Sequence, residues 1–224
     1  MPVLYYTEKE FSELEQNFMF AGNILDSLAR LNYLSSGEGA KKAYYKYIPL
    51  SFTTFISMIQ RSAFYLKGNY PRKFLEVGSG NGLKLIAAAA ILEHYSFRIF
   101  HGIEVLKGQI KFANNLVKKV KDGYGFDANV DCKSFYCDAF NFTHYSDYDL
   151  IYYYCPISDS ELEAKLECLI EKNMKSGSLL VAALKKDRTF EQNKSEFECL
   201  YRSGSNIIIQ KKTLEDEVLK NVIR

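Results

Sequence analysis

The sequence contains no tryptophan, only four prolines and only three histidines in 224 residues. Its five cysteines are an odd number and form no Cys-x-x-Cys pair, which excludes the usual signatures of a disulfide framework and of a structural zinc site. Because the histidines are equally scattered, we expect no bound metal. Unpaired thiols predict a reducing compartment, and hence a cytoplasmic protein.

An excess of charge of one sign is also absent. The 29 basic and 27 acidic residues leave a net charge of +2, so the sequence lacks the strong basic character of a dedicated nucleic-acid-binding protein. No apolar run is long enough to cross a bilayer, and the first residues, MPVLYYTEKEF, lack the basic start and apolar centre of a signal peptide. We therefore expect neither membrane insertion nor secretion.

The sequence does contain enough apolar material for a full core, since 47% of its residues are hydrophobic. Its first part is predicted to be helical. Apolar residues recur at helical intervals within residues 11–31, and Ser51 is a candidate cap for a further helix that ends near Gly68. We divide the chain into a helical region, 1–68, and a second region, 69–224.

Strand and helix signals alternate through most of the second region. The predicted strands span residues 73–78, 98–104, 132–138, 148–156 and 177–184, and the predicted helices span residues 82–95, 106–122 and 159–174. Residues 196–212 differ, because two strand patterns there flank Ser203-Gly204-Ser205, which is a hairpin signal. This order predicts an α/β fold, with a doubly wound, mostly parallel sheet that ends in a C-terminal antiparallel hairpin.

The turn after the first predicted strand carries three glycines, in the stretch LEVGSGNG. Ligands of doubly wound sheets bind beyond the carboxyl ends of the strands, and Gly78, Gly80 and Gly82 would let a ligand approach the main chain there. Glu104 ends the second strand, 22 residues after Gly82. A carboxylate at that place can accept both hydroxyls of a ribose, so the pair predicts an adenosine-containing ligand. The alternative is a tight turn followed by a solvent-facing glutamate.

The glycine spacing separates two classes of adenosine ligand. A dinucleotide site requires Gly-x-Gly-x-x-Gly, but here the third glycine comes one residue early and Leu83 stands in its place. Glu76 lies at the end of the buried strand, where a carboxylate needs a partner, and an amine-bearing ligand would supply one. An oxidoreductase that uses NAD is therefore disfavoured.

At these positions the sequence resembles the class I S-adenosylmethionine (SAM)-dependent methyltransferases, roughly over residues 47–184. LEVGSGNG resembles their motif acid-x-Gly-x-Gly-x-Gly, GIE at Glu104 their second motif, and YCDAFNF, which contains Asp138, their third. The resemblance implies a Rossmann-like fold, SAM as cofactor and S-adenosylhomocysteine as product. It places Glu76 near the methionine amino group, the glycine turn under the ligand, Glu104 at the ribose, and Asp138 with Ala139 beside the adenine. The expected cofactor-binding residues are Glu76, Gly78, Ser79, Gly80, Asn81, Gly82, Glu104, Val105, Asp138, Ala139, Tyr154 and Tyr47.

A second likeness concerns the methyl acceptor. YIPLSF, GIEVLKGQIKFANN and the stretch from Cys155 to Ala182 look similar to the seven-strand protein-lysine methyltransferases, which implies that Tyr47 and Ser51 belong to a lid. Residues 1–68 would then form a substrate-selecting cover. Protein lysine is the first expectation for the acceptor, followed by a small molecule and then RNA.

No catalytic acid–base pair stands out in the sequence. Tyr154, Cys155 and Pro156 fall where methyltransferases of adenine and cytosine amino groups carry Asn/Asp-Pro-Pro-aromatic, and the missing amide or acid argues against amino-base methylation. No second motif supports Cys155 as a covalent nucleophile. These residues fit a buried aromatic strand end equally well. Besides an enzyme, the sequence is compatible with a non-catalytic SAM-binding interaction module.

Overall fold

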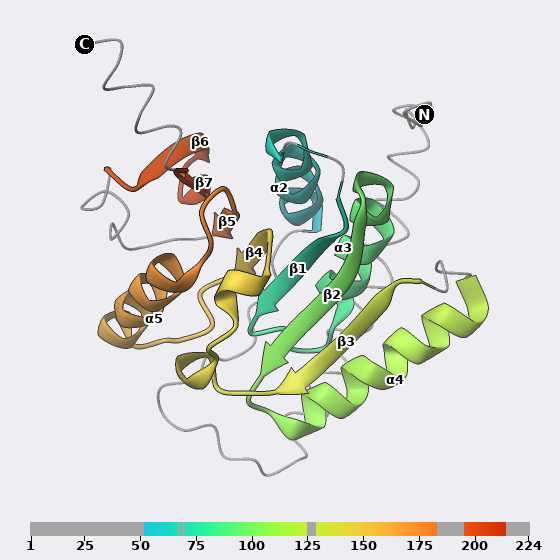
Figure 1. Ribbon diagram of the computed structural model, residues 1–224. Coiled ribbons are helices and arrows are strands. Elements are labelled where there is room, and N and C mark those ends of the chain that lie inside the picture. Colours follow the sequence, from blue (N-terminus) through green and yellow to red (C-terminus); the bar gives the residue numbers. More distant parts are fainter. Residues whose placement is uncertain (1–51, 67, 69, 125–128, 183–194, 214–224) are drawn as a thin grey trace.

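A seven-stranded sheet forms the centre of the protein (Figure 1). The computed structural model describes residues 52–66, 68, 70–124, 129–182 and 195–213. The strand order is β3-β2-β1-β4-β5-β7-β6. The strands are β1 (Arg72–Val77), β2 (Phe97–Glu104), β3 (Asp131–Tyr136), β4 (Leu150–Tyr153), β5 (Leu179–Ala182), β6 (Phe197–Ser203) and β7 (Asn206–Lys211).

The first five strands are parallel, whereas β7 is antiparallel to both β5 and β6. The predicted mostly parallel sheet with a C-terminal hairpin is therefore confirmed. β6 and β7 are joined by a two-residue turn in which Gly204 has φ 58°, a conformation that glycine adopts without strain.

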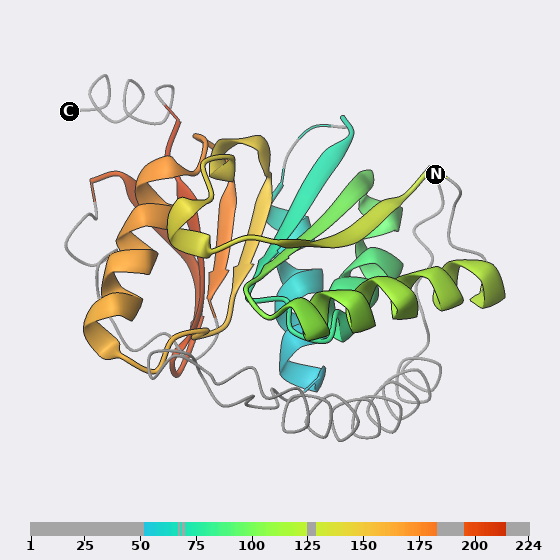
Figure 2. The ribbon, with the colours of Figure 1, turned by 90° about the horizontal axis from the view of Figure 1, so that it is seen from below.

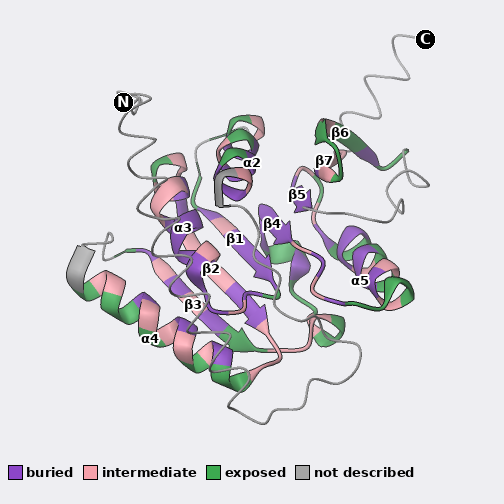
Figure 3. Cartoon of the chain, turned by 180° about the vertical axis from the view of Figure 1, so that it is seen from behind, coloured by how far each residue is buried: buried purple, intermediate pink, exposed green. Residues whose placement is uncertain are grey.

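Helices cover both faces of the sheet (Figure 2). The helices are α2 (Phe52–Tyr65), α3 (Leu83–Leu92), α4 (Lys107–Tyr124) and α5 (Ser160–Asn173). Residues of α2, α3 and α4 share one hydrophobic cluster with one face of the sheet, and α5 packs in a second cluster on the opposite face. Buried residues accordingly concentrate in the strands and in the helix sides that face them (Figure 3).

The alanine-rich run of α3 lies directly against the sheet. Ala87, Ala88 and Ala89 are at most 1% exposed, as expected if small side chains allow a close approach. The approach places the amino terminus of α3 at the carboxyl end of β1, where the glycine turn joins the two elements.

Helix α2 belongs to the predicted region 1–68 but packs into the common core. Phe55 and Ile59 are fully buried, and the Phe55 ring meets the ring of Tyr152 on β4 edge to face, with centroids 4.9 Å apart. Residues 1–51, including Tyr47 and Ser51, lie outside the described residues.

The buried face of helix α5 is not made of its leucines alone. Leu166 is buried, but Leu162 and Leu169 are only half-buried. Three glutamates with helical spacing are buried instead: Glu163, Glu167 and Glu171. The hydroxyl of Tyr153 donates a hydrogen bond of 3.2 Å to Glu163, so part of this polar stripe is satisfied by the strand beneath it.

Gly82, the N-cap of α3, packs closely against Ala113 of α4, so we expect Gly82→Ala to destabilise the protein. Its φ is 75°, and a Cβ there would lie 2.7 Å from the Cβ of Ala113. The combined strain and overpacking predict a loss of about 2–4 kcal/mol in the free energy of unfolding. Gly108→Ala on α4 is the matched control, because a Cβ there meets nothing within 4 Å. Urea denaturation should show a gain of about 0.5–1 kcal/mol for the control, and equal losses for both variants would contradict the packing argument.

Candidate cofactor site

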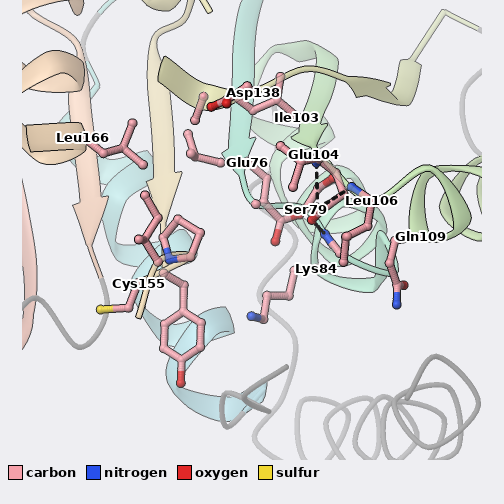
Figure 4. A pocket seen from close by; sticks show the side chains of 18 of the residues that line it. Glu76, Ser79, Lys84, Ile103, Glu104, Leu106, Gln109, Asp138, Cys155 and Leu166 are labelled. Carbon is pink, nitrogen blue, oxygen red and sulfur yellow. Dashed lines mark hydrogen bonds between the residues drawn. The ribbon is translucent and has the colours of Figure 1, made fainter. Parts of the chain in front are cut away.

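A pocket opens at the carboxyl ends of β1, β2 and β4, above the amino terminus of α3 (Figure 4). This is the place where ligands of doubly wound sheets bind, because the strand connections leave the sheet in opposite directions on either side of β1. The lining residues are Glu76, Val77, Gly78, Ser79, Gly80, Asn81, Lys84, Ile103, Glu104, Val105, Leu106, Gln109, Asp138, Ala139, Phe140, Tyr154, Cys155, Pro156, Ile157 and Leu166.

The floor of the pocket is the glycine turn. Gly78 and Gly80 have φ values of 75° and 50°, in the region that favours glycine. A Cβ on Gly78 would also lie 2.8 Å from the Cβ of Pro156, so this glycine lets the turn pass beneath the loop after β4. The side chain of Asn81 accepts a hydrogen bond of 3.1 Å from the backbone N–H of Leu83, which satisfies one of the first donors of α3.

Glu104 holds the turn in place through three backbone N–H groups. Its Oε2 accepts from Gly80 at 2.9 Å, and its Oε1 accepts from Val105 at 2.8 Å and from Leu106 at 3.0 Å. Burial raises the pKa of this carboxyl, and the three hydrogen bonds oppose the shift. Each carboxylate oxygen carries two lone pairs, so Oε2 can still accept a ligand hydroxyl beside the Gly80 N–H.

Glu76 is buried at the end of β1, with 3% of its surface exposed. The backbone N–H of Leu85 donates a hydrogen bond to its carboxylate, while its Oε2 has no hydrogen-bond partner among the described residues. Burial raises the pKa of Glu76 from 4.5 to about 8, and the positive charge of Lys84 opposes that shift. A buried acceptor without a donor is costly, so Glu76 is a position where a ligand donor would be stabilised.

The pocket wall on the β3 side begins after the strand has ended. β3 ends at Tyr136, two residues before the end predicted from the sequence. A short 3-10 helix, η2 (Ala139–Asn141), follows. Asp138 caps this helix by accepting a hydrogen bond of 3.0 Å from the backbone N–H of Phe140. Asp138 and Ala139 are half-buried and face the pocket.

The wall on the β4 side is the segment from Tyr154 to Pro156. Cys155 has φ 32°, which is an unfavourable conformation for a residue other than glycine, and its side chain is buried. Strained residues of this kind persist where surrounding structure holds them, often at ligand sites. The ammonium group of Lys84 lies 4.5 Å from the centre of the Tyr154 ring, in cation–π contact.

The structure brings together all the predicted cofactor-binding residues except Gly82 and Tyr47. Gly82 is not among the lining residues and packs against Ala113 of α4 instead. Tyr47 lies outside the described residues. Sequence reasoning missed Lys84, Gln109 and several apolar lining residues. Lys84 had a signal, because it comes two residues after the glycine motif, at the start of the predicted helix; Gln109 and the apolar residues had none.

Neither a metal site nor a membrane-spanning helix is found among the described residues. Nowhere in that part of the chain do three or more His, Cys, Asp or Glu side chains gather as metal ligands would. None of its helices combines the length and apolar character needed to cross a membrane.

No protein-family model matches this chain, and no curated protein is found as a relative. Solved structures do match. Magnesium protoporphyrin IX methyltransferase from Synechocystis PCC 6803, with bound SAM, is 11% identical with a TM-score of 0.53, over 84% of this chain and 97% of that one. A SAM-dependent methyltransferase (described as putative) from Methanococcus maripaludis is 16% identical with a TM-score of 0.49, over 72% and 87%. Precorrin-6y C5,15-methyltransferase from Geobacter metallireducens GS-15 is 15% identical with a TM-score of 0.48, over 79% and 96%. The fold assignment rests on the first of these, whose TM-score is above 0.5.

Proposed function

Because the chain has the fold of the class I SAM-dependent methyltransferases, we propose that it is a SAM-dependent methyltransferase. The observation that carries the proposal is the buried Oε2 of Glu76, which lacks a donor among the described residues at the pocket's floor. The methionine end of SAM carries an ammonium group, which is the kind of donor that this oxygen needs. The residues present therefore fit this cofactor.

The other lining residues have roles that follow from their positions. Glu104 accepts the ribose hydroxyls while its three backbone contacts keep it oriented. Asp138 accepts from the adenine amino group, and Ala139 with Phe140 packs beside the base. When bound, SAM supplies an electrophilic methyl group, so the task of these residues is to position it and exclude water.

The methyl acceptor belongs at the β4 side, beside Tyr154 and Cys155. We place protein lysine first, on the likeness of the segments around Tyr47 and after Cys155 to the protein-lysine methyltransferases, followed by a small molecule and RNA. All five cysteines are free thiols, which supports a reducing, cytoplasmic location.

Calorimetry with SAM, S-adenosylhomocysteine and NAD tests the cofactor. We expect SAM and S-adenosylhomocysteine to bind at micromolar concentrations or below and NAD not to bind, because the glycine spacing is that of SAM proteins. Binding of NAD with none of SAM would overturn the proposal.

Turnover is tested by tritiated-SAM labelling of a cell extract, with the labelled fraction treated with protease or nuclease. Tight SAM binding without any labelled product would instead identify a non-catalytic SAM-binding module.

A further inference from the structure

A row of lysines follows one side of α4. Four of the five lysines of this helix are separated by four, seven and three residues, the intervals that place side chains along one side of a helix: Lys107, Lys111, Lys118 and Lys121. The first three are exposed, and Lys111 and Lys118 have no acidic partner among the described residues. The single acid of α4 is Asp122, in its last turn. The row is therefore a local positive surface, which the small net charge of the whole chain conceals.

The lysine row runs beside β3, the outermost strand on its side of the sheet (Figure 1). The side chain of Asn114 on α4 accepts a hydrogen bond of 2.8 Å from the backbone N–H of Ser134 on β3 and donates one of 2.9 Å to its carbonyl. Nearer the start of β3, the ammonium of Lys121 donates to the carbonyl of Val130. These bonds hold the helix and the strand side by side, so the lysine row has a fixed place next to the end of β3.

Two exposed aromatic residues end β3. Tyr136 is 63% exposed and Phe135 is 38% exposed, and consecutive strand residues point to opposite faces of a sheet, so one ring lies on each side of this edge. Each ring has an ammonium group near it. Lys107 lies 5.0 Å from the centre of the Tyr136 ring, and Lys133, which also pairs with Asp131, lies 5.2 Å from that of Phe135. An exposed ring beside a cation offers a flat face to a nucleic-acid base and a positive charge to the adjoining phosphate.

We propose that the lysine row of α4 and the aromatic end of β3 together bind single-stranded nucleic acid. Lysines alone would attract any polyanion, an acidic protein included, but the exposed rings favour a strand whose bases can stack. The row spans about 21 Å along the helix axis, which matches about six nucleotides at a rise of about 3.4 Å each. The surface lies on the β3 side of the pocket, and the inference does not depend on the proposed function.

The test measures the fluorescence anisotropy of a labelled single-stranded oligouridylate of about 16 nucleotides, the upper end of the site sizes of such surfaces. Lys111→Gln combined with Lys118→Gln should weaken binding by about tenfold or more. The slope of log affinity against log salt should change from about −2 to about −0.7, because each phosphate contact contributes about 0.7 and two of the three exposed lysines are lost. Unchanged melting temperatures would confirm that the variants fold.

The aromatic part of the surface is tested by Tyr136→Ala. It should weaken binding by about five- to a hundredfold through the loss of base stacking, without changing the salt slope. Tyr136→Phe should keep the affinity, since its ring also stacks. If Tyr136→Ala has no effect while polyglutamate binds with the same dependence on the lysines, the surface belongs to an acidic protein and the inference is overturned.

The matched control combines Lys165→Gln with Lys172→Gln. These exposed lysines of α5 carry the same charge on the opposite face of the sheet, so their loss should leave the affinity for oligouridylate unchanged. An equal weakening in the control would show that binding follows net charge alone and would overturn the inference. Absence of oligouridylate binding by the unaltered protein would also overturn it. Self-association of the α4 double variant in that case would show that the lysines protect the edge of β3 from pairing with another chain.

Discussion

Glu76→Gln should weaken the binding of S-adenosylhomocysteine by about ten- to a hundredfold at pH 7.5, while making the ligand-free protein more stable in alkaline solution. The loss of affinity follows because a neutral amide replaces the carboxylate that pairs with the ligand ammonium, and a hydrogen bond to a charged group contributes about 1.5–3 kcal/mol. S-adenosylhomocysteine, the product, is a suitable ligand for this measurement because its amino-acid end is the same as that of SAM.

The affinity of the unaltered protein should depend on pH in a way that the variant does not share. Glu76 has a pKa of about 8 in the ligand-free fold, so below that pH it is mostly protonated and must lose its proton to pair with an ammonium. Affinity should therefore rise by about tenfold per pH unit between pH 5.5 and 7.5. With glutamine at this position the slope should vanish, so that the two proteins converge at acidic pH. Calorimetry in buffers of different ionisation enthalpy should show one proton released per ligand bound by the unaltered protein.

The stability of the ligand-free protein should fall, not rise, as the pH increases. Burial raises the pKa of Glu76 above its unfolded value of 4.5, so the stability it contributes is fully present below pH 4.5 and is lost as the pH rises through about 8. The loss is on the order of a few kcal/mol. Glu76→Gln has no ionisation to disfavour, so its melting temperature should exceed that of the unaltered protein at pH 8.5. Glu198→Gln, at an exposed position on β6, is the control for both measurements. A pH slope that persists in Glu76→Gln would assign the titration to another group.

The sequence was sufficient to predict those features that depend on local pattern. The order of strands and helices follows from the apolar periodicity, and the final hairpin follows from Ser203-Gly204-Ser205 between two strand patterns. Glu76, Gly78, Glu104 and Asp138 meet in one pocket because the carboxyl ends of parallel strands share one edge of the sheet.

The features that the sequence did not predict depend on how distant elements meet. Gly82 belongs to the glycine motif in the sequence, but its close packing against Ala113 on the next helix cannot be predicted from that motif. Lys84 reads as an ordinary exposed residue of a first helical turn, and its position over Tyr154 depends on where the chain goes after β4. The inward face of α5 carries glutamates that no hydrophobic pattern would place there, and the partner of one of them, Glu163, is Tyr153 on β4.

Asp149→Ala should cause a marked loss of stability without weakening SAM binding. Asp149 is 2% exposed and lies just before β4, at the end of the strand that is remote from the pocket. Its Oδ1 pairs with Lys175 at 2.6 Å and accepts from the hydroxyl of Tyr70 at 3.1 Å, and its Oδ2 accepts from the backbone N–H of Lys73 at 2.8 Å. Alanine leaves all three donors without this acceptor, although the partly exposed side chains of Lys175 and Tyr70 can turn to water. Because Lys175 is partly exposed, solvent screens the ion pair, and the loss expected is that of hydrogen bonds to a buried carboxylate, about 1.5–3 kcal/mol.

The comparison of Asp149 with Lys175 separates the buried charge from the hydrogen bonds. Asp149→Asn retains an acceptor for the N–H of Lys73, so urea denaturation should show a smaller loss than for alanine. Lys175→Met leaves the buried carboxylate without its cation, and the double variant with Asp149→Asn should recover about 1–3 kcal/mol relative to the sum of the two single changes. All four proteins should bind S-adenosylhomocysteine with unchanged affinity when folded, because β1 and β4 carry the pocket at their other ends. A loss of affinity in step with the loss of stability would show that the pocket responds to any weakening of the sheet.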